Sequence, residues 1–296
     1  MSHAIIIPIY CENRNTINLC NELQNFGAEH IVVVNDGLNP KSEYFNELTS
    51  IGCHLVHLKN NNGKGASLKA GIKYAHDNLY NITGYITCDA DGQHTANDVM
   101  KISRMLDLRN GNLILGKRDY KKSKMPINIR IGNRLSSAYF KVITGKSCRD
   151  TQTGLRGIPA FLYDTVMKTK GSRFDFEMNF LTKCADMRVP FYFVNIIADC
   201  SNCSSNFRLI KDTYLIYRTP LRFATASIGC TIIDLVLFTI FAYILPSHMF
   251  FNIMLATLMA RVVSGGINFL INRTNIFLSC KSRIYTHYHY IFYKWQ

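Results

Sequence analysis

Charged residues are scarce in this sequence of 296 residues, and they are unevenly distributed. They make up 18% of the chain, whereas hydrophobic residues make up 48% and aromatic residues 12%. Because a disordered chain has low hydrophobicity and few aromatic residues, this composition excludes disorder. Residues 223–271 contain only two charged side chains, Asp234 and Arg261, so the remainder is more polar than the average indicates. The sequence therefore predicts two unlike parts.

The sequence also lacks the features of a secreted, disulfide-rich protein. Its ten cysteines are scattered without the dense, even spacing of a disulfide scaffold, which predicts a reducing compartment. Cys200 and Cys203 form the only C-x-x-C, and a structural zinc site usually needs a second such pair. The apolar run in residues 1–10 is too short for a signal peptide and has no basic segment before it. We expect a buried strand there.

Two glycine-rich nucleotide-binding motifs are missing as well. Neither G-x-G-x-x-G nor G-x-x-x-x-G-K-[ST] occurs, which excludes the dinucleotide fingerprint and the P-loop. Gly63 and Gly65 flank Lys64 before a helical stretch, so this segment either approaches a phosphate closely or simply begins a helix. The net charge of +14 comes with no recognisable nucleic-acid-binding motif, so nucleic acid is not a predicted partner.

Short β-branched runs alternate with segments of helix length from residue 1 to about residue 200. This alternation is typical of βαβ units, so the predicted fold class is α/β with a mostly parallel central sheet. Ligands of such sheets bind beyond the carboxyl ends of the strands, where chemistry is therefore expected. The predicted strands are residues 4–9, 31–34, 54–58, 85–88 and 113–115.

Asp89 and Asp91 follow the predicted strand at residues 85–88. Strand alternation would place both carboxylates on the same side, where their oxygens suit a hard divalent cation. A lone D-x-D also arises by chance, so a solvated acidic turn is the alternative interpretation.

Residues 223–245 and 249–271 are each long enough to span a bilayer as a helix. The segment that connects them has no Lys or Arg, so the positive-inside rule predicts two spans with both termini and the catalytic part cytoplasmic. Asp234 and Arg261 lie near the middle of their helices, where we expect them to pair, the alternative being a role in handling a lipid phosphate. A buried helical hairpin of a soluble protein is the other interpretation. The flanking basic residues are Arg218, Arg222, Arg273, Lys281 and Arg283.

An ordered set of motifs resembles the polyprenyl-phosphate branch of the family 2 glycosyltransferases, which includes dolichol-phosphate mannose synthases and bactoprenol glucosyltransferases. The resemblance covers residues 4 to about 218. Its motifs are PIYCE (8–12), VNDG (34–37), GKG (63–65), DADGQH (89–94), GKR (116–118), DTQTGLR (150–156), FDFEM (174–178) and SNFR (205–208).

The resemblance implies a GT-A fold, that of nucleotide-diphospho-sugar transferases. It also implies inverting, metal-dependent transfer of a hexose from a nucleotide-sugar, of the UDP-glucose or GDP-mannose type, to polyprenyl or dolichyl phosphate. The product would be a lipid-phosphate-linked sugar used in glycan modification. Because a phosphate acceptor is already ionised at pH 7, no strong general base is required, and neutralising charge is the main task.

The resemblance assigns roles to individual residues. The nucleotide-sugar would be bound by Pro8, Tyr10, Glu12, Asp36, Lys64, Asp89, Ala90 and Arg208. The ligands of Mg2+ or Mn2+ would be Asp89, Asp91 and Gln93. The catalytic residues would be Asp91, Arg118 and Asp150, and the acceptor phosphate would be bound by Arg118, Arg130 and Ser136. For Asp150 and Glu177 the alternative role is a helix or turn cap. For Arg118 and Arg130 it is a solvated helix charge, and for Arg208 it is ordinary positive-inside anchoring.

Two positions depart from the family pattern. Asn35-Asp36 stands where many relatives have two acids, which leaves the base specificity open, and Cys11 replaces the usual asparagine before Glu12. Three other functions share part of this pattern of motifs. A processive polysaccharide synthase needs Q-x-x-R-W, which is missing. A membrane-anchored nucleotidyltransferase usually has a glycine-rich basic loop after the first strand. A catalytically silent membrane partner that assists translocation of lipid-linked sugars would not need Asp89, Asp91 and Arg118.

The predicted domains are a GT-A domain at residues 1–203, a basic interfacial helix at 204–222, a transmembrane hairpin at 223–271 and a basic cytoplasmic tail at 272–296. The hairpin resembles part of the GtrA-like membrane module, which usually has four helices. Assembly into a homo-oligomer is left open. Residues 101–149 carry thirteen Lys or Arg against two Asp, so most of the net positive charge is expected to face anionic headgroups and the acceptor.

Overall fold

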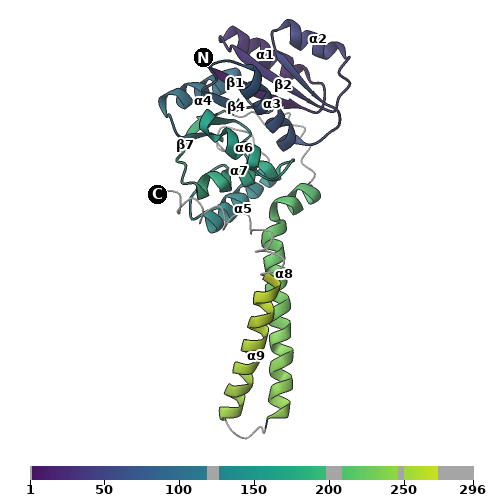
Figure 1. Ribbon diagram of the computed structural model, residues 1–296, viewed down its shortest axis with the longest axis vertical. Helices are drawn as coiled ribbons and strands as arrows, with labels where there is room; N and C mark the ends of the chain where they lie inside the picture. The colour runs from purple at the N-terminus through teal and green to yellow at the C-terminus, as the bar shows by residue number, and fades with distance from the viewer. Residues whose placement is uncertain (1, 119–126, 198–208, 246–249, 273–296) are drawn as a thin grey trace, which may run out of the picture. The chain divides into compact units, whose positions relative to one another are not determined.

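The computed structural model describes residues 2–118, 127–197, 209–245 and 250–272 (Figure 1). The chain divides into two compact units, Met1–Asp212 and Thr213–Gln296. The first unit holds the sheet and the motif residues, and the second holds most of the apolar hairpin. Three sets of residues singled out in the sequence lie outside the described residues: Arg208, predicted to bind the donor, the C-x-x-C of Cys200 and Cys203, and the lysines of 121–124.

The first unit is built on a seven-stranded sheet with the order β3-β2-β1-β4-β6-β5-β7. All neighbouring strands pair in parallel except those that flank β6, which runs antiparallel to both β4 and β5. The predicted α/β class with a mostly parallel sheet is confirmed. The strands are β1 (His3–Ile9), β2 (His30–Asp36), β3 (His54–Leu58), β4 (Gly84–Thr87), β5 (Leu113–Arg118), β6 (Arg156–Pro159) and β7 (Phe191–Ile196).

Helices cover both faces of this sheet, and the side chains of β1 alternate between them. Ile5 and Ile7 pack in the core that includes residues of α1, α2 and α4, whereas Ile6 packs in the core formed with α3, α5, α6 and α7. Because both faces of β1 are buried, its sequence is a nearly continuous apolar run. The helices are α1 (Arg14–Asn25), α2 (Glu43–Ser50), α3 (Lys64–Asn78), α4 (Ala96–Leu108), α5 (Ile127–Thr144), α6 (Tyr163–Lys168) and α7 (Asp175–Asp186).

Polar residues set where the helices begin, and so where the loops at the strand ends stop. Asn13, Ser42 and Thr95 cap α1, α2 and α4 by accepting hydrogen bonds from backbone N–H groups of the first turn. Gly63 begins α3 with φ of 94°, a conformation that side chains other than glycine's rarely adopt. The GKG segment therefore begins a helix, and its lysine projects from the first turn.

The second unit contains two long apolar helices, α8 (Leu209–Ile244) and α9 (Phe250–Asn272). The segments Ser227–Ile244 and Phe251–Leu270 are long and apolar enough to cross a membrane. The sequence predicted an interfacial helix that ends at residue 222 and a separate first span that begins at residue 223. In the structure, α8 is one continuous helix that includes both sides of this boundary.

The predicted pairing of Asp234 with Arg261 is confirmed. The Nε atom of Arg261 lies 3.3 Å from Oδ2 of Asp234, and the Ser264 hydroxyl donates a 2.9 Å hydrogen bond to Oδ1 of the same carboxylate. Ala256, Ala260 and Ser264 lie four residues apart on α9 and are buried. Small residues at this spacing allow the backbones of two helices to approach closely.

Candidate active site

The site is located at the carboxyl ends of β1, β2, β4 and β5. These strands run in one direction, so the loops that follow them leave the sheet at the same edge. The first three strands are direct neighbours in the order β2-β1-β4. The edge therefore collects the predicted motif residues from distant parts of the sequence, as expected for a ligand site of an open α/β sheet.

The centre of the site is an ionic cluster around Lys64. The Nζ atom of Lys64 lies 2.6 Å from Oδ1 of Asp89 and 3.1 Å from Oε1 of Glu177, and all three side chains are largely buried. Burial alone would lower the pKa of Lys64, but the charges of Asp89 and Glu177 outweigh it and raise that pKa. The ammonium group is thus held charged between a carboxylate of the D-x-D motif and one from α7.

Asp89 is fixed from several sides. Burial would raise its pKa, yet Lys64 and His94 together lower it, so the carboxylate is ionised. His94 Nε2 lies 3.6 Å from Oδ2 of Asp89, too far for a hydrogen bond, and among the described residues neither nitrogen of this buried ring has a hydrogen-bond partner. Gly154 lies directly against Asp89, because a Cβ built there would be 2.1 Å from Oδ2.

Asp91 lies in the same loop, close enough to Asp89 for their charges to interact. Burial and then the negative charge of Asp89 raise the pKa of Asp91. The side-chain amide of Gln93 donates to Oδ2 of Asp91, and the Gln93 backbone N–H donates to Oδ1 at 3.1 Å. The strand ends at Thr87, so the motif is placed by a loop and not by the strand alternation that the sequence analysis invoked.

Tyr10 belongs to this cluster from the side of β1. Burial, then the neighbouring Cys11 and the carboxylates of Asp91 and Asp89, raise the pKa of Tyr10 to about 12. Ala90, between the two aspartates, accepts a 3.1 Å hydrogen bond from the Thr16 hydroxyl through its carbonyl. The predicted donor-binding residues Tyr10, Asp89 and Ala90 therefore lie together, whereas Pro8 is buried within β1.

Asp36 holds the loop that precedes α3. Its two carboxylate oxygens accept hydrogen bonds from the backbone N–H groups of Asn62 and Gly63, at 2.8 and 2.9 Å. Asn35 closes its own turn, since its side-chain oxygen accepts from the N–H of Leu38 at 2.7 Å. The Asn35-Asp36 pair thus shapes the loops on both sides of the site, and Asp36 positions the turn from which Lys64 projects.

Arg118 and Asp150 form a buried bidentate pair. The Nε and Nη2 atoms of Arg118 donate to the two carboxylate oxygens of Asp150, each at 2.7 Å. Two residues predicted as catalytic are therefore brought together, and they neutralise each other. Charge-assisted pairs of this fork geometry orient the guanidinium firmly.

Arg156 and Ser136 hold the loop that contains Asp150. Arg156 is buried, and it donates to the backbone carbonyls of Thr153, Thr151 and Glu177. Ser136, predicted to bind the acceptor phosphate, is also buried and accepts a 2.9 Å hydrogen bond from the Thr151 hydroxyl. This contact favours a structural role for Ser136, whereas Arg130 is exposed on α5.

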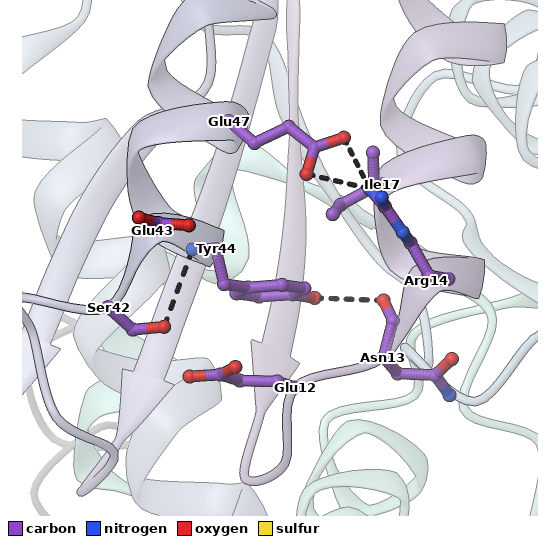
Figure 2. A pocket seen from close by; sticks show the side chains of 8 residues that line it. All are labelled: Glu12, Asn13, Arg14, Ile17, Ser42, Glu43, Tyr44 and Glu47. Atoms are coloured by element: carbon purple, nitrogen blue, oxygen red, sulfur yellow. Dashed lines mark hydrogen bonds and ion pairs between the residues drawn. The ribbon is translucent and has the colours of Figure 1, made fainter.

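A pocket of about 470 Å³ lies between the beginnings of α1 and α2 (Figure 2). Glu12, on the loop after β1, is exposed at this pocket. Arg14 donates to both carboxylate oxygens of Glu47 across it, at 2.6 and 2.7 Å, and the Tyr44 hydroxyl donates to the Asn13 carbonyl at 3.1 Å. The α2 side of the pocket was not predicted, because Tyr44 and Glu47 belong to no recognisable motif.

The donor set fits a hard divalent cation. Asp89, Asp91 and Glu177 supply three carboxylates against the single ammonium of Lys64, so the cluster keeps a surplus of negative charge and of oxygen ligands. Within the described ranges, no group of three or more His, Cys, Asp and Glu side chains converges as a ready-made metal site. Two motif carboxylates can bind Mg2+ or Mn2+ where phosphate oxygens and water complete the coordination.

The parallel sheet, with its carboxylates at the strand ends and the antiparallel strand between β4 and β5, defines an α/β protein with a GT-A-like fold. The family model described as Glycosyl transferase family 2 matches residues 4–164, which is more than half of the chain. The chain belongs to this family of glycosyltransferases. The hairpin lies outside the matched residues, so its resemblance to the GtrA-like module stays a prediction.

Two relatives and one solved structure illustrate this family membership. An uncharacterized protein of Methanocaldococcus jannaschii is 31% identical over 186 residues, which cover 60% of this chain and 73% of the relative. The UDP-N-acetylglucosamine–dolichyl-phosphate N-acetylglucosaminyltransferase of Methanococcus voltae is 29% identical over 170 residues, covering 51% and 67%. Glucosyl-3-phosphoglycerate synthase from Mycobacterium tuberculosis, crystallised with Mn2+ and UDP-glucose, shares the fold with a TM-score of 0.56 at 12% identity, covering 75% and 77%.

Proposed function

We propose that this glycosyltransferase moves a sugar from a nucleotide-sugar to a polyprenyl or dolichyl phosphate at a membrane surface, with inversion at the anomeric carbon. The observation that carries the proposal is the ionic cluster of Lys64 with Asp89 and Glu177, together with Asp91 in the same loop as Asp89. Its surplus of negative charge at the sheet edge suits a donor diphosphate that arrives with a divalent cation.

The donor would bind along the edge from β2 to β4. Glu12, at the pocket between α1 and α2, would face the nucleoside, and Tyr10 would lie between the nucleoside and the diphosphate. Asp36 contributes by holding the Asn62-Gly63 turn, which positions Lys64. Lys64 would offer its ammonium to the diphosphate, since it already lies at the carboxylates that face the donor.

Asp89 and Asp91 would hold Mg2+ or Mn2+, with Gln93 orienting Asp91 through its amide. When bound, the ion supplies Lewis-acid stabilisation of the leaving diphosphate. The protein's own contribution is to keep Asp89 ionised through Lys64 and to keep Asp89 in place through Gly154.

The acceptor would meet the Arg118–Asp150 pair. A phosphate monoester is ionised at pH 7, so the protein needs to orient it and balance its charge, and it does not need to remove a proton. Asp150 holds the Arg118 guanidinium in one orientation, which prepares it for bidentate contact with phosphate oxygens. Arg130, exposed on α5, is a further candidate for this contact.

The membrane part of the proposal rests on α8 and α9. Both are long and apolar enough to span a bilayer, and a polyprenyl phosphate is itself embedded in one. We propose two spans with both termini and the catalytic unit on the cytoplasmic side, as the positive-inside rule predicts. The name of the Methanococcus voltae relative adds a dolichyl-phosphate acceptor and a UDP-N-acetylglucosamine donor to the substrates worth testing.

The test is lipid labelling by membranes that contain the full-length protein. Membranes would be incubated with labelled UDP-glucose, GDP-mannose or UDP-N-acetylglucosamine, undecaprenyl or dolichyl phosphate, and Mg2+ or Mn2+. We expect one donor to label the lipid, and Asp91→Ala to abolish the labelling. Asp77→Asn, which changes an exposed carboxylate on α3, is the matched control and should label normally.

Labelling by none of the donors, or full labelling by Asp91→Ala, would contradict the proposed activity. The first result would favour the catalytically silent membrane partner. Release of diphosphate from a nucleoside triphosphate without sugar transfer would favour the membrane-anchored nucleotidyltransferase.

A further inference from the structure

A polar groove runs along one side of the apolar hairpin. It has a volume of about 290 Å³ and lies between α8 and α9, in the second unit alone. Its walls are polar or small on both helices, although most of the surrounding exposed side chains are Ile, Leu, Val, Met and Phe. The lining residues are Ser227, Cys230, Thr231, Asp234, Arg261, Ser264, Gly265 and Asn268.

Arg261 is the residue in the groove that most needs a partner. Its side chain is 74% exposed, whereas that of Asp234 is 17% exposed. Among the described residues, Asp234 is the one ion-pair partner of Arg261, and the guanidinium makes no hydrogen bond. The terminal nitrogens therefore have hydrogen-bonding capacity that no described residue uses.

The depth of Arg261 makes this exposure costly in a bilayer. Arg261 is the middle residue of α9, so it lies roughly 16 Å along the helix from either end. The hydrocarbon core is about 30 Å thick, so the guanidinium would lie near its centre, beyond easy reach of the headgroups. Charged groups at that depth face protein or a water-filled cavity and not lipid.

Gly265 leaves room for another helix to approach this guanidinium. A Cβ built on Gly265 meets no atom within 4 Å, so the groove is open at this residue. Gly265 is one turn along α9 from Arg261, and both line the groove. A glycine at such a position lets a second backbone come close enough for side-chain hydrogen bonds between helices.

We propose that the groove is the contact surface for a second copy of this hairpin, packed about a two-fold axis. Arg261 of each copy would donate to the carboxylate of Asp234 in the other. The groove is self-complementary, as a two-fold contact requires, because it carries one acid and one base. Each copy contributes zero net charge, so the pair of hairpins would bring no uncompensated charge into the bilayer. This inference rests on the proposed membrane insertion of α8 and α9.

A second copy fits better than a lipid phosphate. Lipid tails offer no hydrogen-bond acceptor, and the phosphate of a lipid lies at the surface, about half the bilayer thickness away. Asp234 has acceptor capacity left, because a carboxylate has about four lone-pair directions and only Ser264 and Arg261 occupy them among the described residues.

The test counts protomers of the full-length protein in liposomes. Protein carrying one fluorophore per chain would be reconstituted into phosphatidylcholine and phosphatidylglycerol vesicles over a wide range of protein-to-lipid ratios, and photobleaching steps would be counted. The variant is Gly265→Leu, which fills the groove. The control is Gly229→Leu, an equal change on α8 at a residue that also has open space around its Cβ but does not line the groove.

We expect dimers for the wild type and for Gly229→Leu, and a dissociation constant at least about tenfold larger for Gly265→Leu. Both variants replace glycine inside a helix by a better helix former, so neither should prevent folding. A monomeric wild type at every density, or equal effects of the two variants, would overturn the inference. Unchanged dimers with weaker use of the lipid acceptor by Gly265→Leu would also overturn it and would assign the groove to lipid.

Flotation of the vesicles separates this inference from the proposed function. Protein that floats, transfers sugar to lipid and stays monomeric contradicts the second copy alone. Protein that does not float contradicts membrane insertion, and the inference falls with it. Protein that floats and dimerises but labels no lipid contradicts the proposed activity and leaves the contact surface supported.

Discussion

The two units of the molecule both contain ion pairs, but they balance the charges differently. In the α/β unit, Lys64 meets the carboxylates of Asp89 and Glu177, with Asp91 nearby, so negative charge is in excess. In the hairpin, Asp234 and Arg261 form one pair of equal and opposite charge. An excess calls for a ligand of opposite charge, whereas a balanced pair needs only correct geometry. The contrast separates a binding site from a packing element.

The largest expected effect comes from removing the cation of the first cluster. Lys64→Met leaves Asp89 and Glu177 buried without their partner, and we expect the free energy of unfolding to fall by about 4 kcal/mol. Urea denaturation followed by circular dichroism measures this. Lys73→Met, on the same helix but in an exposed pair with Asp77, is the control and should be nearly neutral. Equal losses in the two variants would contradict the importance of burial.

The same variant should change how stability depends on pH. The pKa of Asp89 is lowered in the folded protein, so its stabilising contribution is present above the unfolded pKa of about 4 and is lost as the pH falls. Without Lys64 this contribution is missing at neutral pH. We therefore expect the wild type to lose more stability than Lys64→Met as the pH falls below about 4, and a parallel decline of both proteins in that range would contradict this.

The next largest effect is expected on the rate of sugar transfer, and it tests the position of Asp89 in the first cluster. Gly154→Ala places a Cβ atom against the Asp89 carboxylate and displaces it, so we expect the rate of sugar transfer to fall at least about 100-fold. Initial rates at saturating donor and Mn2+ measure the change. Gly132→Ala is the matched control, because a Cβ there would meet only Gln152, at 3.8 Å. A normal rate for Gly154→Ala would show that Asp89 need not be held in this position.

A smaller effect is expected for the balanced pair of the hairpin. Asp234→Asn and Arg261→Gln should each destabilise the hairpin, and the double variant should lose less than the sum of the two by about 1 kcal/mol. Unfolding in mixed micelles with increasing SDS measures the three variants. Strictly additive losses would show that the two side chains do not depend on each other.

The smallest effect is expected for an ion pair in water. Arg14 and Glu47 form two short hydrogen bonds but are largely exposed, so Arg14→Gln should change the free energy of unfolding by less than about 0.5 kcal/mol. The urea experiment used for Lys64→Met applies here as well. A loss as large as that of Lys64→Met would mean that the α1–α2 pocket excludes water far more than its exposed side chains indicate.

Local sequence patterns predicted strands β1 to β5, but not β6 and β7. β1 to β5 appear in the sequence as apolar runs between segments of helix length, and each was predicted close to its observed bounds. β6 reads Arg-Gly-Ile-Pro, which has no alternation of apolar and polar residues, and its pairing partners lie 41 or more positions away along the chain. β7 is half-buried at the edge of the sheet, so its apolar signal is weak.

The candidate active site, like the sheet, could be predicted only in part from local sequence patterns. Asp89, Asp91, Arg118 and Asp150 could be selected from motifs, because each belongs to a motif that resembles the family pattern. The contact of Lys64 with Glu177 joins α3 to α7, and no local pattern encodes such a contact. Ser136 was predicted to bind the acceptor, but the structure buries it against Thr151. Position along the sequence shows which residues gather at the edge, and packing decides which of them face outward.

The placement of β6 also dictates an order of assembly. β4 and β5 follow each other along the chain, yet they do not pair, because β6 enters between them from the C-terminal side. A nascent chain emerging from the ribosome can join β1, β2, β3 and β4, but β4 keeps an open edge until Pro159 has been synthesised. The loop that brings Gly154 to Asp89 arrives with that strand. A fragment that ends before residue 159 would therefore retain the D-x-D motif while exposing an aggregation-prone edge.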